Sequence, residues 1–301
     1  MDLRWDNEVV VVTGAGGGLG RAYALELGRR GARVIVNDLG GTADGRESDQ
    51  RAAILVAEEI RAAGGEASAN FDTVATPEGG KSIVDQAIST YGKIDAVIAN
   101  AGILRDKSFN KMEWADVKSV IDVNLMGVFH VAQPAYQAMK EAGTPGRLVL
   151  TTSASGLFGN FGQANYTAAK MGVVGLMRTL SIEGAKAGIR VNAVSPVAGT
   201  RLTGDAEVTA KDDPMAPHRV APIAVALTHK DCPISGDIFL ATGGWYSRVF
   251  VGLTDGWVAG ADELSVEGIA AHWDQIRDTS TWSEPRSAMD IGPLLEQKLY
   301  T

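Results

Sequence analysis

The sequence predicts one doubly wound α/β domain with a seven-stranded parallel sheet, followed by a C-terminal extension. Short apolar runs rich in β-branched residues alternate with longer segments of helical periodicity over roughly the first 240 residues. A glycine-rich turn joins the first apolar run to the first helical segment. With 301 residues, of which 45% are hydrophobic, the chain is long enough to bury the core of such a domain.

The expected strands are short runs whose apolar character suits burial on both faces of a sheet. They are Val9–Thr13, Arg33–Asp38, Glu66–Phe71, Ile94–Ala99, Arg147–Thr152, Ile189–Ser195 and Asp237–Leu240. The expected helices cover residues 19–30, 49–63, 77–91, 113–141, 164–187 and 218–229. Because helices separate the strands, successive strands lie parallel and helices cover both faces. We therefore expect one domain, residues 1–245.

The tail, residues 246–301, departs from this alternation and is expected to pack on the domain or on a neighbouring subunit. Ser247–Leu253 and Trp257–Ala259 alternate around Asp255-Gly256, which predicts a hairpin. Ser265–Asp278 has the period of an amphipathic helix. The last 20 or so residues show no clear period.

Composition excludes several classes of function. The net charge is −8 and no cluster of Lys and Arg is present, so a nucleic-acid partner is not expected. No apolar run is long enough for a membrane span, and neither end resembles a secretory signal or a peroxisomal tripeptide. The four histidines and the single cysteine, Cys232, have no metal-ligand spacing, so no metal is expected. The cytoplasm is the expected location.

The glycine-rich turn, residues 13–20, follows the first strand and opens the first helix. Glycines there allow the backbone to approach a pyrophosphate, and the helix N-terminus offers free N–H groups and the positive end of its dipole. The candidate cofactor contacts in this turn are Gly14, Gly17, Gly18, Leu19 and Gly20.

Two acidic residues indicate which dinucleotide binds. Asp38 ends the second strand, 18 positions after Gly20, close to the offset of a carboxylate that accepts from ribose hydroxyls. A carboxylate there repels a 2′-phosphate, which favours NAD over NADP. Asp72 follows the third strand and could accept from the adenine amino group.

A candidate catalytic constellation surrounds the fifth strand and the helix after it. Ser153 follows that strand, and Tyr166 and Lys170 are four residues apart, so they share one helix face. Asn100-Ala101-Gly102 follows the fourth strand and Asn124 lies in the next helix. Ser153 stands outside a G-x-S-x-G elbow, which disfavours a hydrolase.

With these residues, the chain resembles the short-chain dehydrogenase/reductase family over about residues 6–245. Within it, the chain is similar to the (3R)-hydroxyacyl-CoA dehydrogenase unit of multifunctional enzyme type 2. The narrower resemblance rests on residues 37–41, 100–106 and 153–166 and on the polar loop, residues 40–49. The resemblance implies a Rossmann domain and hydride transfer between a secondary alcohol or ketone and NAD.

The chemistry assigns roles to the constellation. Hydride transfer requires proton transfer at the substrate oxygen. A neighbouring ammonium and the positive nicotinamide ring favour the phenolate of Tyr166, lowering its pKa toward the working range. Tyr166 is thus the expected acid/base, Ser153 polarises the substrate oxygen, and Lys170 also holds the nicotinamide ribose. The resemblance implies that Asn124 holds a water beside Lys170 and that Asn100 braces the sheet and the adenosine ribose.

The resemblance also assigns the junction after the sixth strand to the nicotinamide carboxamide. Pro196 and Thr200 are the candidates there, although Val197 stands where many relatives have glycine. A substrate lid is expected over Arg201–Pro217.

Several substrates and one other class of function stay open. The expected substrate is a (3R)-hydroxyacyl-CoA, with a steroid alcohol or a 3-oxoacyl thioester as alternatives. A non-catalytic NAD-sensing scaffold is the alternative from another class. A homodimer or homotetramer is expected, because relatives pair through the helices that carry Asn124 and Tyr166, and because Met171–Met177 is apolar.

Overall fold

The computed structural model describes residues 3–45, 51–200, 202, 210 and 212–299. They divide into two compact units, Met1–Arg248 and Val249–Thr301. Among the described residues, no helix combines the length and the apolar character that a bilayer span requires.

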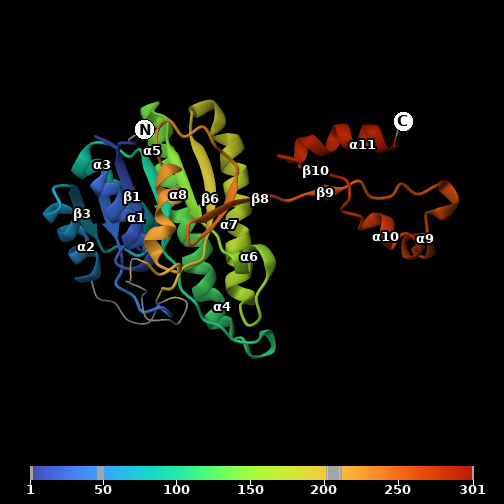
Figure 1. Ribbon diagram of the computed structural model, residues 1–301, viewed down its shortest axis with the longest axis horizontal. Coiled ribbons are helices and arrows are strands. Elements are labelled where there is room, and N and C mark those ends of the chain that lie inside the picture. The colour runs from blue at the N-terminus through green and yellow to red at the C-terminus, as the bar shows by residue number, and fades with distance from the viewer. Residues whose placement is uncertain (1–2, 46–50, 201, 203–209, 211, 300–301) are drawn as a thin grey trace. The chain divides into compact units, whose positions relative to one another are not determined.

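The first unit is built on an eight-stranded sheet of order β3-β2-β1-β4-β5-β6-β7-β8 (Figure 1). The strands are β1 Val9–Thr13, β2 Arg33–Asn37, β3 Glu66–Asn70, β4 Ala96–Ala99, β5 Arg147–Thr151, β6 Arg190–Pro196, β7 Ile238–Thr242 and β8 Trp245–Val249. Neighbours from β3 through β7 pair in parallel. The predicted α/β class is confirmed, with one strand more than expected.

The eighth strand arises from a tight turn. Gly243 and Gly244 both have positive φ, 57° and 92°, as in a two-residue hairpin turn. The Tyr246 hydroxyl donates to the carbonyl of Arg219 at 2.8 Å, and Arg248 Nε donates to Asp237 Oδ1 at 3.0 Å. The chain therefore adds β8 at the sheet edge, two residues before the strand expected at Ser247–Leu253.

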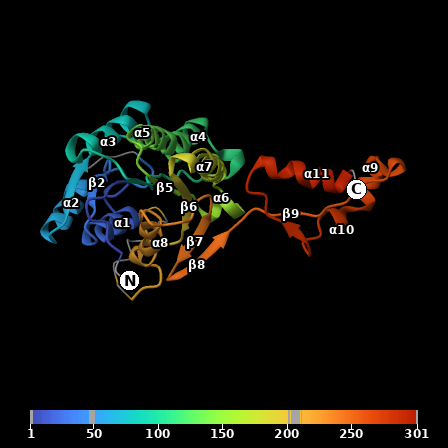
Figure 2. The ribbon, with the colours of Figure 1, turned by 90° about the horizontal axis from the view of Figure 1, so that it is seen from above.

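Helices cover both faces of the sheet (Figure 2). In chain order they are α1 Gly18–Arg29, α2 Arg51–Ala62, α3 Pro77–Tyr91, α4 Trp114–Ile121, α5 Gly127–Ala142, α6 Ala154–Phe158, α7 Ala164–Glu183 and α8 Ala221–Ala226. Helices α1 and α8 pack together on one face, while α3 with α5 and α4 with α7 pack on the other. One buried cluster joins the valines of β1 and β2 to α1, α2 and α8.

Two expected helices differ in detail, and one helix was not expected. The segment 113–141 is continuous, but a π-helical turn, η2 Asp122–Met126, separates α4 from α5. The helix expected at 218–229 is a 3₁₀ turn, Pro217–Arg219, followed by the short α8. Helix α6 was not expected, because five residues are too few for a periodic signal.

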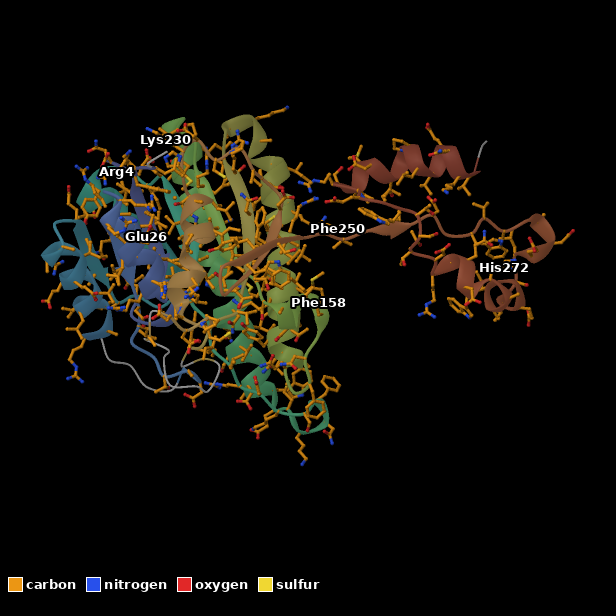
Figure 3. All side chains as sticks on the ribbon, in the orientation of Figure 1. Arg4, Glu26, Phe158, Lys230, Phe250 and His272 are labelled. Atoms are coloured by element: carbon orange, nitrogen blue, oxygen red, sulfur yellow. The ribbon has the colours of Figure 1, made fainter. Side chains whose placement is uncertain are left out.

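The second unit corrects the expected hairpin. Strand β9, Leu253–Thr254, pairs antiparallel with β10, Trp282–Ser283, so Trp257–Ala259 is not its partner. Phe250 stacks on Trp282 with ring centroids 4.6 Å apart (Figure 3). The two paired strands lie about 30 residues apart in the sequence. Alternation of polar and apolar residues within one short segment cannot reveal such a distant pairing.

The helices of the second unit also differ from expectation. The segment 265–278 is divided at His272 into α9 Val266–Ala271 and α10 Trp273–Ile276. The His272 ring stacks on Trp257 with centroids 3.9 Å apart (Figure 3). Helix α11, Ile291–Leu299, lies in the stretch for which no period was found.

Four hydrogen bonds between the carboxyl ends of β1 and β4, which we call the β1–β4 cross-link, position the candidate site. The strand order reverses between β1 and β4, which leaves a crevice at their carboxyl ends. Thr13 Oγ1, in a residue only 2% exposed, accepts from the N–H groups of Asn100 and Ala101 at 3.0 and 3.1 Å. Asn100 Nδ2 donates in return to the carbonyls of Thr13 and Gly14 at 3.1 and 3.2 Å.

Replacing Thr13 with Val should destabilise the fold and weaken nucleotide binding together. The methyl group leaves two N–H groups without their acceptor, which costs about 2 kcal/mol of unfolding free energy. Urea unfolding and calorimetric titration with the dinucleotide measure the two effects. Thr228→Val is the control, because Thr228 is equally buried but bonds Trp5 Nε1 and the carbonyl of Val225. Unchanged nucleotide affinity in Thr13→Val would contradict this role.

Candidate active site

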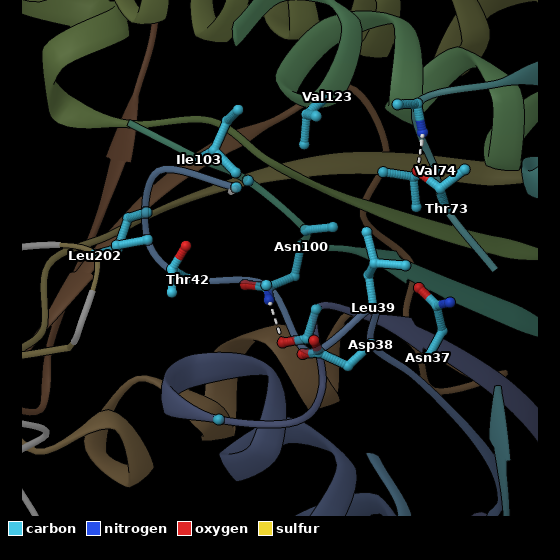
Figure 4. A pocket seen from close by; sticks show the side chains of 18 of the residues that line it. Asn37, Asp38, Leu39, Thr42, Thr73, Val74, Asn100, Ile103, Val123 and Leu202 are labelled. Carbon is cyan, nitrogen blue, oxygen red and sulfur yellow. Dashed lines mark hydrogen bonds between the residues drawn. The ribbon is translucent and has the colours of Figure 1, made fainter. Parts of the chain in front are cut away.

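A pocket of about 410 Å³ opens at the carboxyl ends of β1, β2 and β4 (Figure 4). Ten of the expected cofactor contacts line it: Gly14, Gly17, Gly18, Leu19, Asp38, Asp72, Asn100, Ala101, Gly102 and Thr200. The other four, Gly20, Pro196, Tyr166 and Lys170, are not among its lining residues.

The glycine turn forms one wall because side chains cannot fit there. A β-carbon on Gly14, at φ +65°, would lie 2.8 Å from Ala101 Cα. One on Gly20 would lie 2.1 Å from the carbonyl oxygen of Gly14. The turn thus presents backbone, and the first N–H groups of α1 have no partner within the helix. This cradle fits the pyrophosphate of a dinucleotide.

Asp38 is held at the pocket by two backbone groups. Its Oδ2 accepts from the Gly16 N–H at 2.7 Å and its Oδ1 from the Gly40 N–H at 2.6 Å. Each carboxylate oxygen has a second lone pair for a ligand. In Figure 4, Ile103 and Val123 lie across the pocket from Asp38.

Several residues that line the pocket were not expected from the sequence. They include Asn37, Leu39, Gly41, Thr42, Thr73, Val74, Ile103, Arg105, Ser119, Asp122 and Val123. Some of them adjoin the expected cofactor contacts at the ends of strands. A position at the end of a strand was therefore the sequence signal that could have identified them. Ser119, Asp122 and Val123 come from α4 and η2, whose approach is a tertiary feature.

Lys170 is buried beside Tyr166. Its ammonium group is 5.7 Å from the Tyr166 ring centroid and donates to the carbonyl of Thr151 at 2.9 Å. Burial lowers the pKa of Lys170 from 10.5 to about 8. The i, i+4 spacing on α7 thus gives the neighbouring phenol and ammonium that it predicted.

Desolvation dominates the environment of Tyr166. Burial raises the pKa of Tyr166, a side-chain hydrogen bond with Ser153 lowers it, and the Asp106 carboxylate raises it. Within the protein alone the net direction is upward, and the lowered pKa expected with the positive nicotinamide ring in place stays a prediction. The reason for the upward direction is that desolvation of the phenolate outweighs the stabilising contacts. Ser153 itself is the N-cap of α6, and its Oγ also accepts from the Ser155 N–H at 3.2 Å.

Asn124 lies fully buried in the π-helical turn. Its Nδ2 donates to the carbonyls of Ile103 and Val120 at 2.9 and 3.0 Å, while Oδ1 has no hydrogen-bond partner among the described residues. Asn124 Oδ1 and Lys170 Nζ would lie 2.6 and 3.8 Å from a β-carbon on Gly102. A buried acceptor without a partner requires an explanation such as a bound water.

The junction after β6 lies partly beside the pocket. Thr200 is 8% exposed and lines it, next to the position of a β-carbon on Gly18, whereas Pro196 ends β6. The expected lid, Arg201–Pro217, lies largely outside the described residues, as do residues 46–49 of the polar loop.

The segment after Gly102 is bonded to the start of α7. Gln163 Nε2 donates to Asp106 Oδ2 at 2.7 Å, and Asn165 Nδ2 donates to the carbonyl of Arg105 at 3.1 Å. These contacts hold the residues preceding Tyr166 against the loop that follows β4. Both segments carry the family resemblance, but the sequence alone assigned these residues no role.

Comparison with known proteins identifies the class. A family model described as short chain dehydrogenase matches residues 8–210. The chain belongs to this family and is an oxidoreductase. Members of the family bind a nicotinamide dinucleotide, which agrees with the glycine cradle.

Individual relatives show which members of the family this chain resembles in sequence. A putative short-chain type dehydrogenase/reductase of Mycobacterium tuberculosis is 45% identical over 275 residues, covering 91% of this chain and 95% of that protein. The mouse peroxisomal multifunctional enzyme type 2 is 43% identical over 290 residues, which are 96% of this chain but 39% of that enzyme. The predicted resemblance to the type 2 enzyme is confirmed.

Solved structures agree with this grouping. Full-length peroxisomal multifunctional enzyme type 2 from Drosophila melanogaster matches with a TM-score of 0.82 and 34% identity, covering 99% of this chain and 50% of that one. A short chain dehydrogenase from Mycobacterium avium matches with a TM-score of 0.76 and 35% identity, covering 98% and 95%.

Burial of Lys170 predicts a dependence of stability on pH. Between about pH 8 and 10.5 the unfolded chain keeps a proton that folded Lys170 releases, so the free energy of unfolding rises with pH. The gain is roughly 2 kcal/mol from about pH 8 to about pH 10. It should vanish in Lys170→Met and persist in Lys140→Met, an exposed lysine on α5. Urea unfolding at both pH values is the measurement, and parallel curves for wild type and Lys170→Met would contradict it.

Proposed function

We propose that the protein is an NAD-dependent dehydrogenase that oxidises the secondary alcohol of a (3R)-hydroxyacyl-CoA. The observation that carries the proposal is the grouping of Tyr166, Ser153 and buried Lys170 next to a dinucleotide cradle with a carboxylate on its wall. Bound nicotinamide supplies the hydride acceptor or donor. The residues named below supply binding and proton transfer.

Tyr166 is the proposed acid/base. Its phenolate oxygen takes the alcohol proton during oxidation, and the resulting phenol returns a proton to the substrate oxygen during reduction. Ser153 donates a hydrogen bond to the substrate oxygen and so orients it toward the phenol. The Lys170 ammonium stabilises the phenolate, and its contact with the carbonyl of Thr151 fixes the ammonium in position. A water on Asn124 Oδ1 would link Lys170 to solvent.

Asp38 supports NAD as the cofactor. Both oxygens retain acceptor capacity for ribose hydroxyls, while a 2′-phosphate would bring negative charge against a carboxylate. This favours NAD over NADP. Asp72, which also lines the pocket, is the proposed acceptor for the adenine amino group.

The substrate class is supported by the relatives. Their names include peroxisomal multifunctional enzymes and the hydratase-dehydrogenase-epimerases of Saccharomyces cerevisiae and Neurospora crassa, which point to a hydroxyacyl thioester. The alternatives are a steroid alcohol and, in the reductive direction, a 3-oxoacyl thioester. Formation of reduced nicotinamide with a panel of hydroxyacyl-CoAs and steroid alcohols separates them. Tight NAD binding without turnover of any alcohol would favour the NAD-sensing scaffold.

Three further expectations stay predictions. They are the homodimer or homotetramer, the cytoplasmic location, and the packing of residues 246–301 on the domain or on a neighbouring subunit. Sedimentation at micromolar concentration tests the first, and a monomer would contradict it.

Tyr166→Phe should abolish turnover and leave nucleotide binding nearly intact. The phenyl ring keeps the packing but has no proton to exchange, so kcat falls by about 10²-fold or more. Initial rates and calorimetric NAD titration measure the two effects. Tyr91→Phe on α3 is the control and should retain wild-type rates. A Tyr166→Phe variant as fast as the wild type would overturn the mechanism.

Asp38→Ser should weaken preference for NAD. Loss of the charged acceptor lowers kcat/KM with NAD by about tenfold or more, while the penalty against NADP disappears. The measured quantity is the ratio of kcat/KM for the two cofactors. Asp44→Ser, in the same loop, should leave the ratio unchanged. Equal use of NAD and NADP by the wild type would contradict the role of Asp38.

A further inference from the structure

A chain of three side-chain amides lies behind Asp72. Asn37 ends β2, Asn70 ends β3, and Gln86 projects from α3. Asn37 and Asn70 are each 2% exposed, and Gln86 is half-buried. Asn70 and Gln86 do not line the pocket, so the roles proposed above leave them unexplained.

Hydrogen-bond chemistry fixes which way the Gln86 amide is oriented. Gln86 Nε2 donates to the carbonyl of Ala69 at 2.9 Å and to Ser68 Oγ at 3.0 Å. Because a carbonyl can only accept, the nitrogen of Gln86 must face it. Gln86 Oε1 therefore faces Asn70 and accepts from Asn70 Nδ2 at 2.7 Å.

Asn70 and Asn37 extend these hydrogen bonds to Asp72. Asn70 Nδ2 also donates to Asp72 Oδ2 at 2.9 Å, and Asn70 Oδ1 accepts from the Asp72 N–H at 3.0 Å and from Asn37 Nδ2 at 2.6 Å. Asn70 thereby uses both hydrogens and both lone pairs. Asn37 Nδ2 donates in addition to the carbonyl of Asp72 at 2.9 Å.

Asp72 is consequently held at three points, its N–H, its carbonyl and Oδ2. Its Oδ1 takes part in none of the hydrogen bonds found among the described residues, and Asp72 lines the pocket. The amides thus fix the position of the Asp72 carboxyl group and leave Oδ1 available to accept from a ligand.

We propose that Gln86, Asn70 and Asn37 are positioning residues that make Asp72 select adenine over hypoxanthine in the bound dinucleotide. The inference rests on the proposed use of NAD. Adenine carries a donating amino group at C6, which a carboxylate accepts. Hypoxanthine carries a carbonyl at the same place, which a carboxylate repels, so fixing Asp72 as an acceptor sets the preference.

The test is Asn70→Asp, read by calorimetric titration with NAD and with nicotinamide hypoxanthine dinucleotide. The wild type should bind NAD at least about tenfold more tightly. In the variant, an oxygen replaces the Asn70 nitrogen at 2.9 Å from Asp72 Oδ2, so the donor that fixes Oδ2 is replaced by a carboxyl oxygen that repels it. The affinity ratio should fall about fivefold or more, while kcat at saturating NAD stays within about twofold of wild type.

Two further variants separate positioning from folding. Asn192→Asp on β6 is the matched control, because Asn192 is 1% exposed and also bonds backbone, at the carbonyl of Ile234 and the Asp237 N–H. It should lose stability and keep the wild-type ratio. Gln86→Met, on the half-buried face of α3, removes only the far end of the amide chain and lowers the ratio by about twofold. Gln86→Met provides the test of positioning if the Asn70→Asp variant does not fold.

The outcomes distinguish the inference from the proposed function. An unchanged ratio in both Asn70→Asp and Gln86→Met, or an equal change in Asn192→Asp, overturns the positioning role. Equal affinity of the wild type for both dinucleotides overturns it as well, while leaving NAD dependence in place. Failure of the proposed function has a different signature, in which the wild type binds neither dinucleotide or forms no reduced nicotinamide with any hydroxyacyl-CoA.

Discussion

The cross-link between the carboxyl ends of β1 and β4 determines the geometry of the whole site. A parallel sheet whose order reverses at these strands opens a crevice there, but the crevice alone does not define a binding surface. The Thr13 hydroxyl and the Asn100 amide join the two strand ends through four hydrogen bonds. The glycine cradle on one side and residues 100–102 on the other are thereby held at a fixed separation.

The residues proposed to transfer the proton lie next to this cross-link and share its neighbours. Gly102 has room only for a hydrogen because Asn124 Oδ1 would stand 2.6 Å from its β-carbon. Lys170 is fixed by the carbonyl of Thr151 at the end of β5, the strand beside β4. Burial opposes charge on both the phenol and the ammonium, so the protein alone disfavours the ion pair that the proposed catalysis uses. In the proposed mechanism, the positive nicotinamide ring would offset that cost for the phenolate.

The polar groups that hold Asp72 and Asp38 in place are hydrogen-bonded to defined partners. Asn70 satisfies all four of its hydrogen-bonding positions, and Asp38 is fixed through both of its oxygens by backbone N–H groups. Asn124 Oδ1 is one of the buried atoms without a partner among the described residues, and it faces the space beside Gly102 and Lys170. In the described part of the chain, this unsatisfied atom and the free lone pairs coincide with the positions at which we propose that water and ligand bind.

Local patterns in the sequence were sufficient to predict the parallel sheet, because each buried strand is an apolar run and each crossover helix a period within one segment. They also identified Asp38, Ser153, Tyr166 and Lys170 as candidates, since strand ends and i, i+4 spacing are local features. The eighth strand, the β9–β10 pairing, the π-helical turn at Asn124 and the amide chain behind Asp72 emerged only in the folded chain. These features depend on which distant segments meet and on which polar atoms are left without water, and neither is encoded in a local pattern.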